Sequence, residues 1–461
     1  MNEYLHKPLL LVIFGISGNL AHLKLVPALY HLLLRGELPE KCQIIGISRQ
    51  DYSVDDLLND VRKNLAGEQI DEAVFAELRK RITINKMDLS STRDYTQLKE
   101  ELNAVSASLG SETIRMYYLS IPAQAFSQIV TLLGETGHNE PFANEITQPR
   151  ILVEKPFGYD VASAKALIDS TEKHFSEPQV YRIDHYLAKE TAQNVLTFRF
   201  KNSLFSSIWN AKYIDEIRVS AFESIGIEGR SSFYEQTGAL RDILQSHLLQ
   251  LFALIAMEQP ARLESGDIHR AKLRLLESIH PIEKHEVSEY ATRGQYETYR
   301  KEVENPESLV ETFARLQLEV DNEQWRGTKV IIETGKSMSE KLTQIAVHFR
   351  DNHGNNSDNT LLFRVQPREG ISLLLQAKQP GITNQTETVE MEFDYERSFQ
   401  QASGEAYERV IIDALRGDQS LFASSQEVLA SWRIVEHVLS EWQKPNSTMV
   451  RYEAGAFPDD L

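Results

Sequence analysis

The sequence is poor in cysteine and in long apolar runs. Cys42 is the single cysteine among 461 residues, so no disulfide can form within the chain. This usage is typical of a reducing compartment, and we expect a cytoplasmic location. The longest apolar run near the N-terminus, Leu9 to Phe14, is far too short to cross a bilayer. No small-residue cleavage site follows a signal-like hydrophobic region.

Positive charge is also scarce. Lys and Arg number 49 against 67 Asp and Glu, which gives a formal net charge of −18. This excess of acids argues against nucleic acid or an anionic membrane surface as a partner, because both would repel the chain. A chain of this charge must gather its cations locally wherever it binds phosphate, so Lys and Arg beside glycines become informative.

The first 180 residues alternate between predicted strands and helices. This alternation predicts a doubly wound parallel sheet of the Rossmann type over residues 1–180. The apolar patterns place strands at Leu9–Phe14, Gln43–Ile47, Ile82–Ile84, Arg115–Ser120 and Arg150–Val153. The same reading places one helix up to Leu34 and others over Tyr52–Arg81, Thr92–Ala107 and Ala125–Leu133.

A glycine stretch follows the first predicted strand directly. Gly15 would allow the tight turn, Gly18 would let the backbone approach a pyrophosphate, and Ala21 would permit close helix packing. Strand, glycine turn and helix together are the context of a dinucleotide fingerprint. The spacing G-x-x-G-x-x-A is a variant pattern, and a plain structural turn is the alternative. Lys24 lies one helical turn further on, where it can reach a phosphate or the substrate.

The end of the second predicted strand bears on which nicotinamide cofactor is bound. Domains that read NAD usually place an acid there, whereas Ser48 is followed here by Arg49. An arginine suits a 2′-phosphate and therefore NADP, with NAD possible because Asp51 is close. A surface arginine without a ligand is the alternative.

Beyond residue 180 strands dominate. The patterns predict an α+β domain with a large, mainly antiparallel sheet over residues 181–461. Strands are expected at Phe198–Phe200, Ile217–Ala221, Leu316–Val320, Val330–Glu333, Thr343–Phe349, Leu361–Gln366 and Ile371–Gln376.

The stretch from Tyr181 to Glu190, YRIDHYLAKE, concentrates chemistry-bearing side chains. If its downstream part is helical, His185 and Lys189 share one face. An imidazole, an ammonium and the phenol of Tyr186 would make a grip for a dianionic phosphate. Asp184 precedes this grip and is placed to orient a histidine base from elsewhere. The alternative is a solvated helix start with ordinary ion pairs.

Two further stretches suggest chemistry. Glu154-Lys155-Pro156 ends a predicted strand, where open α/β sheets bind ligands, and the proline bond there is a candidate for the cis form. TGALRDILQSHLLQ, residues 237–250, has a helical apolar pattern that carries Asp242 and His247. These two lie five residues apart, so an α-helix does not place them cleanly on one face. A lone histidine in such a helix is more often a packed core or surface group.

RIDHYLAKE resembles the signature of the glucose-6-phosphate dehydrogenase family. GISGNLA, EKPFG, FESIG, GALRDILQSH, ETGKSM, RVQPREGI, AYERVIIDALRGDQSLF and SWRIVEHVL follow the family's order over essentially the whole chain. The resemblance implies a Rossmann domain and an α+β domain whose sheet commonly forms the dimer contact. It implies oxidation of glucose 6-phosphate at C1 to the 1,5-lactone, with hydride transfer to NADP, no metal, and a homodimer or homotetramer.

The resemblance also implies roles for particular residues. Those matched to catalysis are His247 as the general base, Asp184 as its supporting carboxylate, and Lys155 between nicotinamide and substrate. Those matched to the phosphate grip are His185, Tyr186 and Lys189, and those matched to sugar hydroxyls are Glu223, Asp242, Lys336 and, more weakly, Lys341. Those matched to the cofactor are Gly15, Ser17, Gly18, Leu20, Lys24, Arg49, Tyr118 and Lys155.

The chain departs from the family pattern in several places. His22 stands where a lysine is frequent, and Ser246 replaces the asparagine before the proposed base. Glu333 replaces an arginine near Lys336, and a negative charge there is expected to weaken the grip on a phosphorylated sugar. Two alternatives therefore stay open: a dehydrogenase of another hexose 6-phosphate, and a catalytically idle paralogue that regulates a true enzyme.

Overall fold

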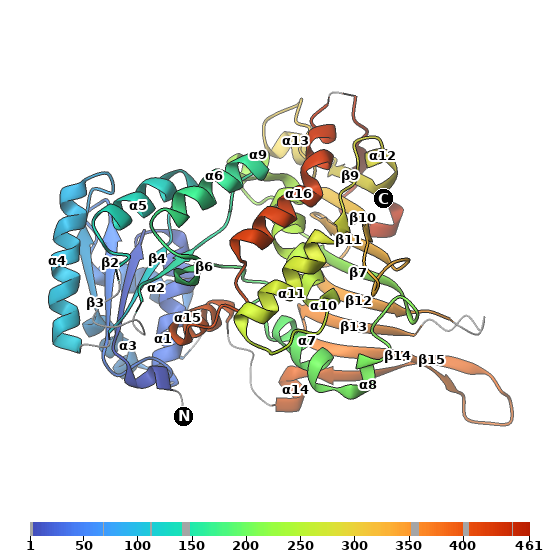
Figure 1. Ribbon diagram of the computed structural model, residues 1–461, viewed down its shortest axis with the longest axis horizontal. Helices are drawn as coiled ribbons and strands as arrows, with labels where there is room; N and C mark the ends of the chain where they lie inside the picture. Colours follow the sequence, from blue (N-terminus) through green and yellow to red (C-terminus); the bar gives the residue numbers. More distant parts are fainter. Residues whose placement is uncertain are drawn as a thin grey trace. The chain divides into compact units, whose positions relative to one another are not determined.

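The computed structural model describes residues 3–67, 69–110, 113–140, 148–351, 359–399, 405–444 and 446–461 (Figure 1). The chain divides into two compact units, each built from discontinuous segments. Unit 1 comprises Met1–Gly158, Ala162–His185 and Gly404–Ser425. Unit 2 comprises Tyr159–Val161, Tyr186–Ser403 and Gln426–Leu461. The assignment of cofactor binding to residues 1–180 and of substrate binding to residues 181–461 stays a prediction.

Unit 1 is built on a six-stranded parallel sheet. Its strand order is β3-β2-β1-β4-β5-β6, the order of dinucleotide-binding folds, so the predicted Rossmann-type sheet is confirmed. The strands are β1 (Leu9–Phe14), β2 (Cys42–Ser48), β3 (Ile82–Lys86), β4 (Ile114–Leu119), β5 (Arg150–Val153) and β6 (Val180–Arg182). Every residue of β1 and β4 is buried, which explains the unbroken apolar run of β1, while β4 also buries Arg115.

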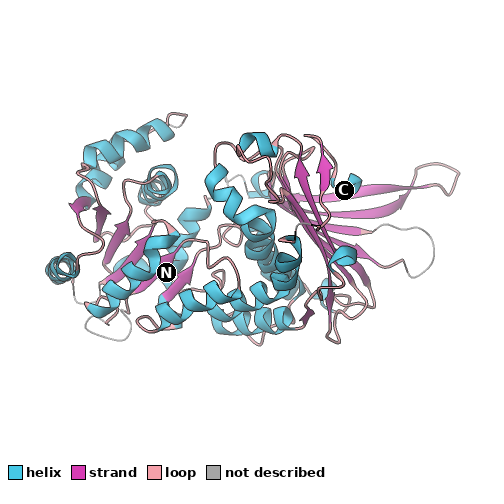
Figure 2. Cartoon of the chain, turned by 90° about the horizontal axis from the view of Figure 1, so that it is seen from above, coloured by secondary structure: helices cyan, strands magenta, loops and turns pink. Residues whose placement is uncertain are grey.

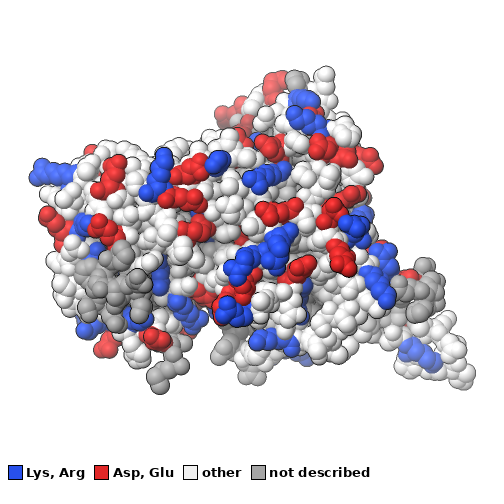
Figure 3. All heavy atoms as spheres, viewed as in Figure 1, with Lys and Arg blue, Asp and Glu red and all other residues white. Residues whose placement is uncertain are grey.

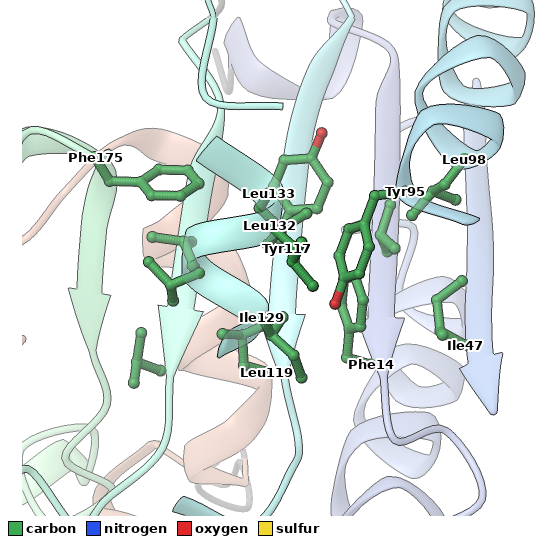
Figure 4. Packing of buried hydrophobic residues seen from close by; sticks show 14 of the residues in the cluster. Phe14, Ile47, Tyr95, Leu98, Tyr117, Leu119, Ile129, Leu132, Leu133 and Phe175 are labelled. Carbon is green, nitrogen blue, oxygen red and sulfur yellow. The ribbon is translucent and has the colours of Figure 1, made fainter. Parts of the chain in front are cut away.

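The helices of unit 1 cover this sheet. They are α1 (Val26–Leu34), α2 (Val54–Asn64), α3 (Glu72–Arg81), α4 (Thr92–Leu109), α5 (Ala123–Glu135), α6 (Val161–Glu172) and α15 (Ala406–Arg416). The single helix expected over Tyr52–Arg81 is wrong, because Asp71 accepts hydrogen bonds from the N–H groups of Ala73 and Val74 and starts α3 afresh. Figure 4 shows α4 and α5 packing on β1 and β4 through side chains such as Tyr95 and Leu133.

Helix α15 joins unit 1 although it lies more than 200 residues beyond the last strand of the sheet. Arg150, on β5, donates hydrogen bonds to the carbonyls of Ala414 and Leu415 at the C-terminal end of α15. Near the other end, the buried carboxylate of Glu408 accepts from Arg35 at 2.6 Å. Free carbonyls at a helix C-terminus favour cations, so Arg150 stabilises the end of α15 that faces the sheet.

Unit 2 contains a large mixed sheet of order β15-β14-β13-β12-β7-β11-β10-β9-β16, with β8 paired to β10. Most neighbours are antiparallel, while β11 runs parallel to β7 and β16 parallel to β9. This confirms the predicted large, mainly antiparallel sheet. The strands are β7 (Ile214–Phe222), β8 (Ile279–His280), β9 (Ala291–Tyr296), β10 (Phe313–Val320), β11 (Lys329–Gly335), β12 (Leu342–Phe349), β13 (Thr360–Gln366), β14 (Gly370–Lys378), β15 (Thr386–Asp394) and β16 (Val450–Tyr452).

The sheet is uneven in its exposure. Strands β14 and β15 extend past the others at one end, with their connecting turn at the tip (Figures 1 and 2).

The strand expected at Phe198–Phe200 is wrong, because these residues lie in α7 (Glu190–Lys201). The other helices of unit 2 are α8 (Ser203–Ser206), α9 (Ser231–Ala239), α10 (Leu249–Ala256), α11 (Ser265–Glu277), α12 (Val287–Tyr290), α13 (Tyr299–Glu302), α14 (Tyr395–Phe399) and α16 (Ser425–Trp442).

Helix α10 is the buried centre of unit 2, and all eight of its residues are buried. Three side chains donate to the carbonyls at its C-terminal end. Arg199 donates to Leu254 at 3.0 Å, Trp209 donates to Ile255 at 2.8 Å, and Trp325 donates to Ala256 at 2.6 Å. Because no water reaches these carbonyls, side-chain donors must replace it. The helix is thus held in a fixed place, and the segment before it carries His247.

One face of the molecule carries charges of both signs. On the face shown in Figure 3, Lys and Arg alternate with Asp and Glu over both units. No helix among the described residues is long and apolar enough to cross a membrane.

Candidate active site and cofactor-binding residues

The glycine loop lies at the C-terminal edge of the parallel sheet, between β1 and the helical segment that follows. Gly15 has φ +80°, and a Cβ there would lie 2.0 Å from the carbonyl oxygen of Ser120. Only glycine therefore lets the loops after β1 and β4 meet at the point where the strand order reverses. Ser17 is exposed beside Gly18. The free N–H groups of the helix start make this loop a fit for a dinucleotide pyrophosphate.

The helix after the loop begins with a π-helical segment, Ala21–Leu25, before it continues as α1. Leu20 immediately precedes this segment and Lys24 lies within it. The ammonium of Lys24 is 3.0 Å from the carboxylate of Glu405, a residue of unit 1 next to α15. Both side chains are about half exposed, so an anionic ligand can compete with Glu405 for Lys24.

The end of β2 carries the residues expected to read the ribose of the cofactor. Arg49 is exposed, and its side chain makes no hydrogen bond or ion pair within the described residues. Asp51 is committed instead, because its carboxylate lies 2.6 Å from the ammonium of Lys86 at the end of β3. The end of β2 thus carries an exposed cation, while the nearby acid is already paired.

A half-buried acid, Glu154, lies beside Lys155 at the end of β5. Tyr118, on β4, donates a hydrogen bond from its hydroxyl to Glu154, and Tyr407 of α15 bonds the same carboxyl. Burial raises the pKa of Glu154 to about 7, against the opposing influence of both phenols and of Lys155. The charge of Asp184 raises this pKa further. The side chain of Tyr118 is fully buried, so its hydroxyl serves Glu154 rather than solvent.

The chemistry-rich stretch is a turn and not a helix. His185–Ala188 form turns after β6, the N–H of Lys189 donates to the carbonyl of Tyr186, and α7 begins only at Glu190. The expectation that His185 and Lys189 share a helical face is therefore wrong. The ammonium of Lys189 is 3.8 Å from Glu369, whose carboxylate also accepts from the N–H of Thr191 at the start of α7.

The segment that carries His247 begins at a backbone kink. Gly238 has φ +64°, and a Cβ there would lie 2.4 Å from a carboxylate oxygen of Glu311. The same carboxylate accepts from the N–H of Leu240 at 2.9 Å, which caps the new helical segment. This arrangement fixes where the segment starts and requires glycine before it.

The segment itself, Leu240–Leu248, is a π-helix, so the α-helical expectation for residues 237–250 is corrected. A π-helix bonds residues five apart, which brings Asp242 and His247 onto the same side. Both side chains are buried. Ser246 donates its hydroxyl to the carbonyl of Asp242 at 2.7 Å, so this departure from the family pattern supports the local backbone.

The imidazole of His247 has an aromatic neighbour from the turn. The ring of Tyr186 is stacked on it, with centroids 4.3 Å apart and an angle of 17° between the planes. Tyr186 and His247 lie 61 positions apart in sequence, so the fold of unit 2 brings one residue of the expected phosphate grip onto the expected base. Stacking restricts rotation of the imidazole and keeps one face dry.

Glu223 and Lys336 form a second polar pair in unit 2. The ammonium of Lys336 donates to the carboxylate of Glu223 and lies 5.3 Å from the centre of the Tyr234 ring. Glu223 is held by two backbone bonds, from its N–H to Gly335 and from the N–H of Met338 to its carbonyl. Lys341 is exposed in the turn between β11 and β12.

The predicted site residues fall into two groups. Unit 1 holds the expected cofactor residues together with Asp184 and His185, and unit 2 holds the remaining expected substrate residues and His247. Sequence reasoning missed Tyr407, Glu311 and Glu369 as partners of site residues. The sequence around these three residues does not indicate their partners, because each contacts a residue that is distant in sequence.

The architecture defines a nicotinamide-dependent oxidoreductase: a parallel dinucleotide-binding sheet joined to a second unit with a buried histidine. A family model described as the NAD binding domain of glucose-6-phosphate dehydrogenase matches residues 12–194, and the C-terminal domain model matches residues 196–459. The chain belongs to the glucose-6-phosphate dehydrogenase family.

Individual relatives agree with this assignment. The chain is 37% identical to a glucose-6-phosphate 1-dehydrogenase of Chlamydia muridarum, over 97% of this chain and 93% of the relative. It is 34% identical to that of Bacillus subtilis, over 98% and 96%. A solved glucose-6-phosphate dehydrogenase in complex with glucose 6-phosphate superposes with a TM-score of 0.91 at 31% identity, over 98% of this chain and 95% of that one.

Proposed function

We propose that this chain oxidises D-glucose 6-phosphate at C1 to 6-phospho-D-glucono-1,5-lactone, the first oxidative step of the pentose phosphate pathway, with NADP as the preferred hydride acceptor. The observation that carries the proposal is the stacked pair of Tyr186 and His247. It joins the phosphate-gripping turn to a buried imidazole, which is what a phosphosugar dehydrogenase needs in one place.

Substrate binding uses two sets of side chains. His185, Tyr186 and Lys189 grip the phosphate, whose dianion displaces Glu369 from Lys189 because charge-assisted bonds to phosphate are stronger than a 3.8 Å ion pair. Glu223, Asp242, Lys336 and Lys341 contact the sugar hydroxyls. The mutual neutralisation of Glu223 and Lys336 lets that pair offer both acceptors and donors to neutral hydroxyls.

The chemistry needs a base at the C1 hydroxyl. His247 in its neutral form accepts that proton, and Asp184 stabilises the imidazolium that results. Lys155 orients substrate and nicotinamide at the end of β5. When bound, the nicotinamide ring supplies the acceptor for the hydride that leaves C1. The fixed start of the π-helix and the stacked Tyr186 hold the imidazole ready before substrate arrives.

Cofactor preference is assigned to Arg49. Its uncommitted guanidinium suits the 2′-phosphate of NADP, while the acid that would read the ribose of NAD is paired with Lys86. We further propose a homodimer or homotetramer in which the unit 2 sheet forms the subunit contact.

Reduced-nicotinamide absorbance tests the proposal directly. Purified protein mixed with glucose 6-phosphate and NADP should turn over, and Arg49→Ala should raise the KM for NADP far more than that for NAD. His247→Ala should lower kcat by about 10²–10⁴-fold with little change in substrate affinity. His437→Ala, on α16 beside Glu283, is the matched control and should leave turnover unchanged.

Three outcomes would contradict the proposal. Preserved turnover in His247→Ala would remove this residue as the base. Faster turnover on a hexose 6-phosphate altered at C2 would favour a dehydrogenase of another sugar phosphate, and measurable NADP binding without turnover on any sugar would favour the idle paralogue.

A further inference from the structure

Two cations lie at the edge of the unit 1 sheet where β2 and β3 end. In the parallel register Ser48 is opposite Lys86, and Arg49 follows Ser48 directly. Because parallel strands end at a common edge, the side chains of Arg49 and Lys86 start from neighbouring positions there. In a chain with a net charge of −18, two cations placed together at a ligand-binding edge call for an explanation.

The backbone around these residues is tied to the glycine loop. The hydroxyl of Ser48 donates to that of Ser17 at 3.3 Å and accepts from the N–H of Gln50 at 3.2 Å. The carbonyl of Ser48 accepts from the N–H of Met87 at 2.9 Å, which fixes the exit of β3. The cations therefore flank the same edge that receives the cofactor, at the ribose end and not at the nicotinamide end.

Lys86 is held by an acid that solvent reaches. Its ammonium lies 2.6 Å from Asp51, and the side chains of Lys86 and Asp51 are 57% and 87% exposed. Exposed ion pairs are loosely held, and an ammonium has three donors, so Lys86 can turn one of them to a doubly charged phosphate while it stays paired with Asp51. While the pair exists, Asp51 is neutralised as a reader of the ribose hydroxyl.

We propose that Lys86 is a specificity-determining residue for the cofactor, acting together with Arg49 as the second cation for the 2′-phosphate and cancelling the charge of Asp51. This inference rests on the proposed function, in which NADP is the preferred cofactor. It assigns to Lys86 two effects of the same sign: attraction of the phosphate and removal of a competing acid.

Binding of cofactor fragments tests the inference without any turnover. Isothermal titration calorimetry with 2′,5′-ADP and with 5′-AMP separates the 2′-phosphate from the rest of the nucleotide. Lys86→Met should weaken 2′,5′-ADP binding by about tenfold or more, the usual size of one lost charge-assisted contact, and change 5′-AMP binding by less than about twofold. The weakening should shrink at high salt.

Asp51 supplies the matching variant. Asp51→Asn should strengthen 2′,5′-ADP binding relative to 5′-AMP. In the Asp51→Asn background, Lys86→Met should reduce the affinity for 2′,5′-ADP by a smaller factor than in the natural sequence, because no carboxylate is left at position 51 to repel the phosphate. Lys165→Met is the control: Lys165 is an exposed lysine on α6 that pairs with Asp169 at 3.0 Å, and its loss should leave both affinities unchanged.

The outcomes separate this inference from the proposed function. Suppose the natural protein binds 2′,5′-ADP. If Lys86→Met then binds it equally well, or loses affinity for 2′,5′-ADP and 5′-AMP to the same extent, the role of Lys86 is overturned while the proposed NADP reaction stands. Natural protein that binds 2′,5′-ADP no better than 5′-AMP overturns the NADP preference and this inference with it. If Lys86→Met unfolds at the same midpoint temperature as the natural protein, a loss of affinity is local to the binding site.

Discussion

A buried ion pair in unit 2 offers the sharpest test of how the His247 segment is held. Lys272 on α11 and Glu427 on α16 are both fully buried, with Nζ and Oε2 2.8 Å apart. Lys272 also donates to the side-chain carbonyl of Gln250 at 3.1 Å, three residues after His247. His269 lies 2.8 Å from the other oxygen of Glu427. Three helices thus meet at one ammonium.

Replacing Lys272 by methionine keeps most of the side-chain volume and removes the charge. The buried carboxylate of Glu427 then keeps its contact with His269 but loses the ammonium, and the side-chain amide of Gln250 loses a donor. Removing one partner of a buried pair costs about 3–5 kcal/mol of unfolding free energy. The double variant Lys272→Met/Glu427→Leu should recover most of this loss, because an apolar pair replaces the charges.

Urea unfolding followed by tryptophan fluorescence measures these differences, and kcat reports on the base. Lys272→Met should lower both stability and kcat, and the double variant should restore stability more than kcat because Gln250 stays without its donor. Lys165→Met, in an exposed pair, should change stability by less than about 0.5 kcal/mol. A single variant within about 1 kcal/mol of the natural protein, or a double variant as unstable as the sum of both singles, would refute the reasoning.

Three further outcomes are expected. Burial raises the pKa of Glu154 to about 7, so the unfolding free energy falls by about 3 kcal/mol as pH rises from 4.5 to 7. Glu154→Gln should remove this pH dependence of stability, which urea unfolding at pH 5 and pH 8 measures. Trp325→Phe leaves the carbonyl of Ala256 without its indole donor and should cost about 1–3 kcal/mol in the same assay. Arg315→Met unpairs Glu333 in part and should cost at least about 1 kcal/mol, with the KM for glucose 6-phosphate unchanged.

The central strands of the parallel sheet were predictable from sequence because they are buried on both faces. Leu9–Phe14 and Arg150–Val153 coincide with β1 and β5 to the residue. The edge strand β15 of the second sheet was missed in the sequence. Strand β15 is exposed over most of its length, so glutamates take the positions where a core strand would show apolar side chains.

The error at Phe198–Phe200 has a different cause. Two aromatic residues around Arg199 resemble the alternation of a half-buried strand. The structure buries Arg199, whose guanidinium caps the end of α10 and lies over the ring of Trp209. Burial lowers the pKa of Arg199 to about 9. Because Arg199 is the buried residue, the side that looks polar in the sequence is the inner side of α7. Sequence periodicity cannot reveal its hydrogen-bond partner, Leu254, which lies 55 positions away.

The sequence suggests candidate site residues but not their geometry. The glycine loop, Arg49 and the chemistry-rich turn were recognisable because their chemistry lies in consecutive residues. The relation of Asp242 to His247 depends on a π-helix, which α-helical periodicity does not describe. Both π-helical segments of the described chain, Ala21–Leu25 and Leu240–Leu248, lie at expected functional stretches, where such irregularities are frequent.

The replacement of arginine by Glu333 shows how the structure resolves a conflict that the sequence raises. Glu333 is buried on β11, where Arg315 lies 2.7 Å away on β10 and Arg218 lies 3.4 Å away on β7, and Ser220 donates to it at 2.8 Å. Its charge is thus matched by guanidiniums on both neighbouring strands. Lys336 has its own acid, Glu223, and does not serve Glu333. The electrostatics of the proposed sugar-binding pair are therefore set by Glu223, and the compensated charge of Glu333 argues against the expected penalty on phosphosugar affinity.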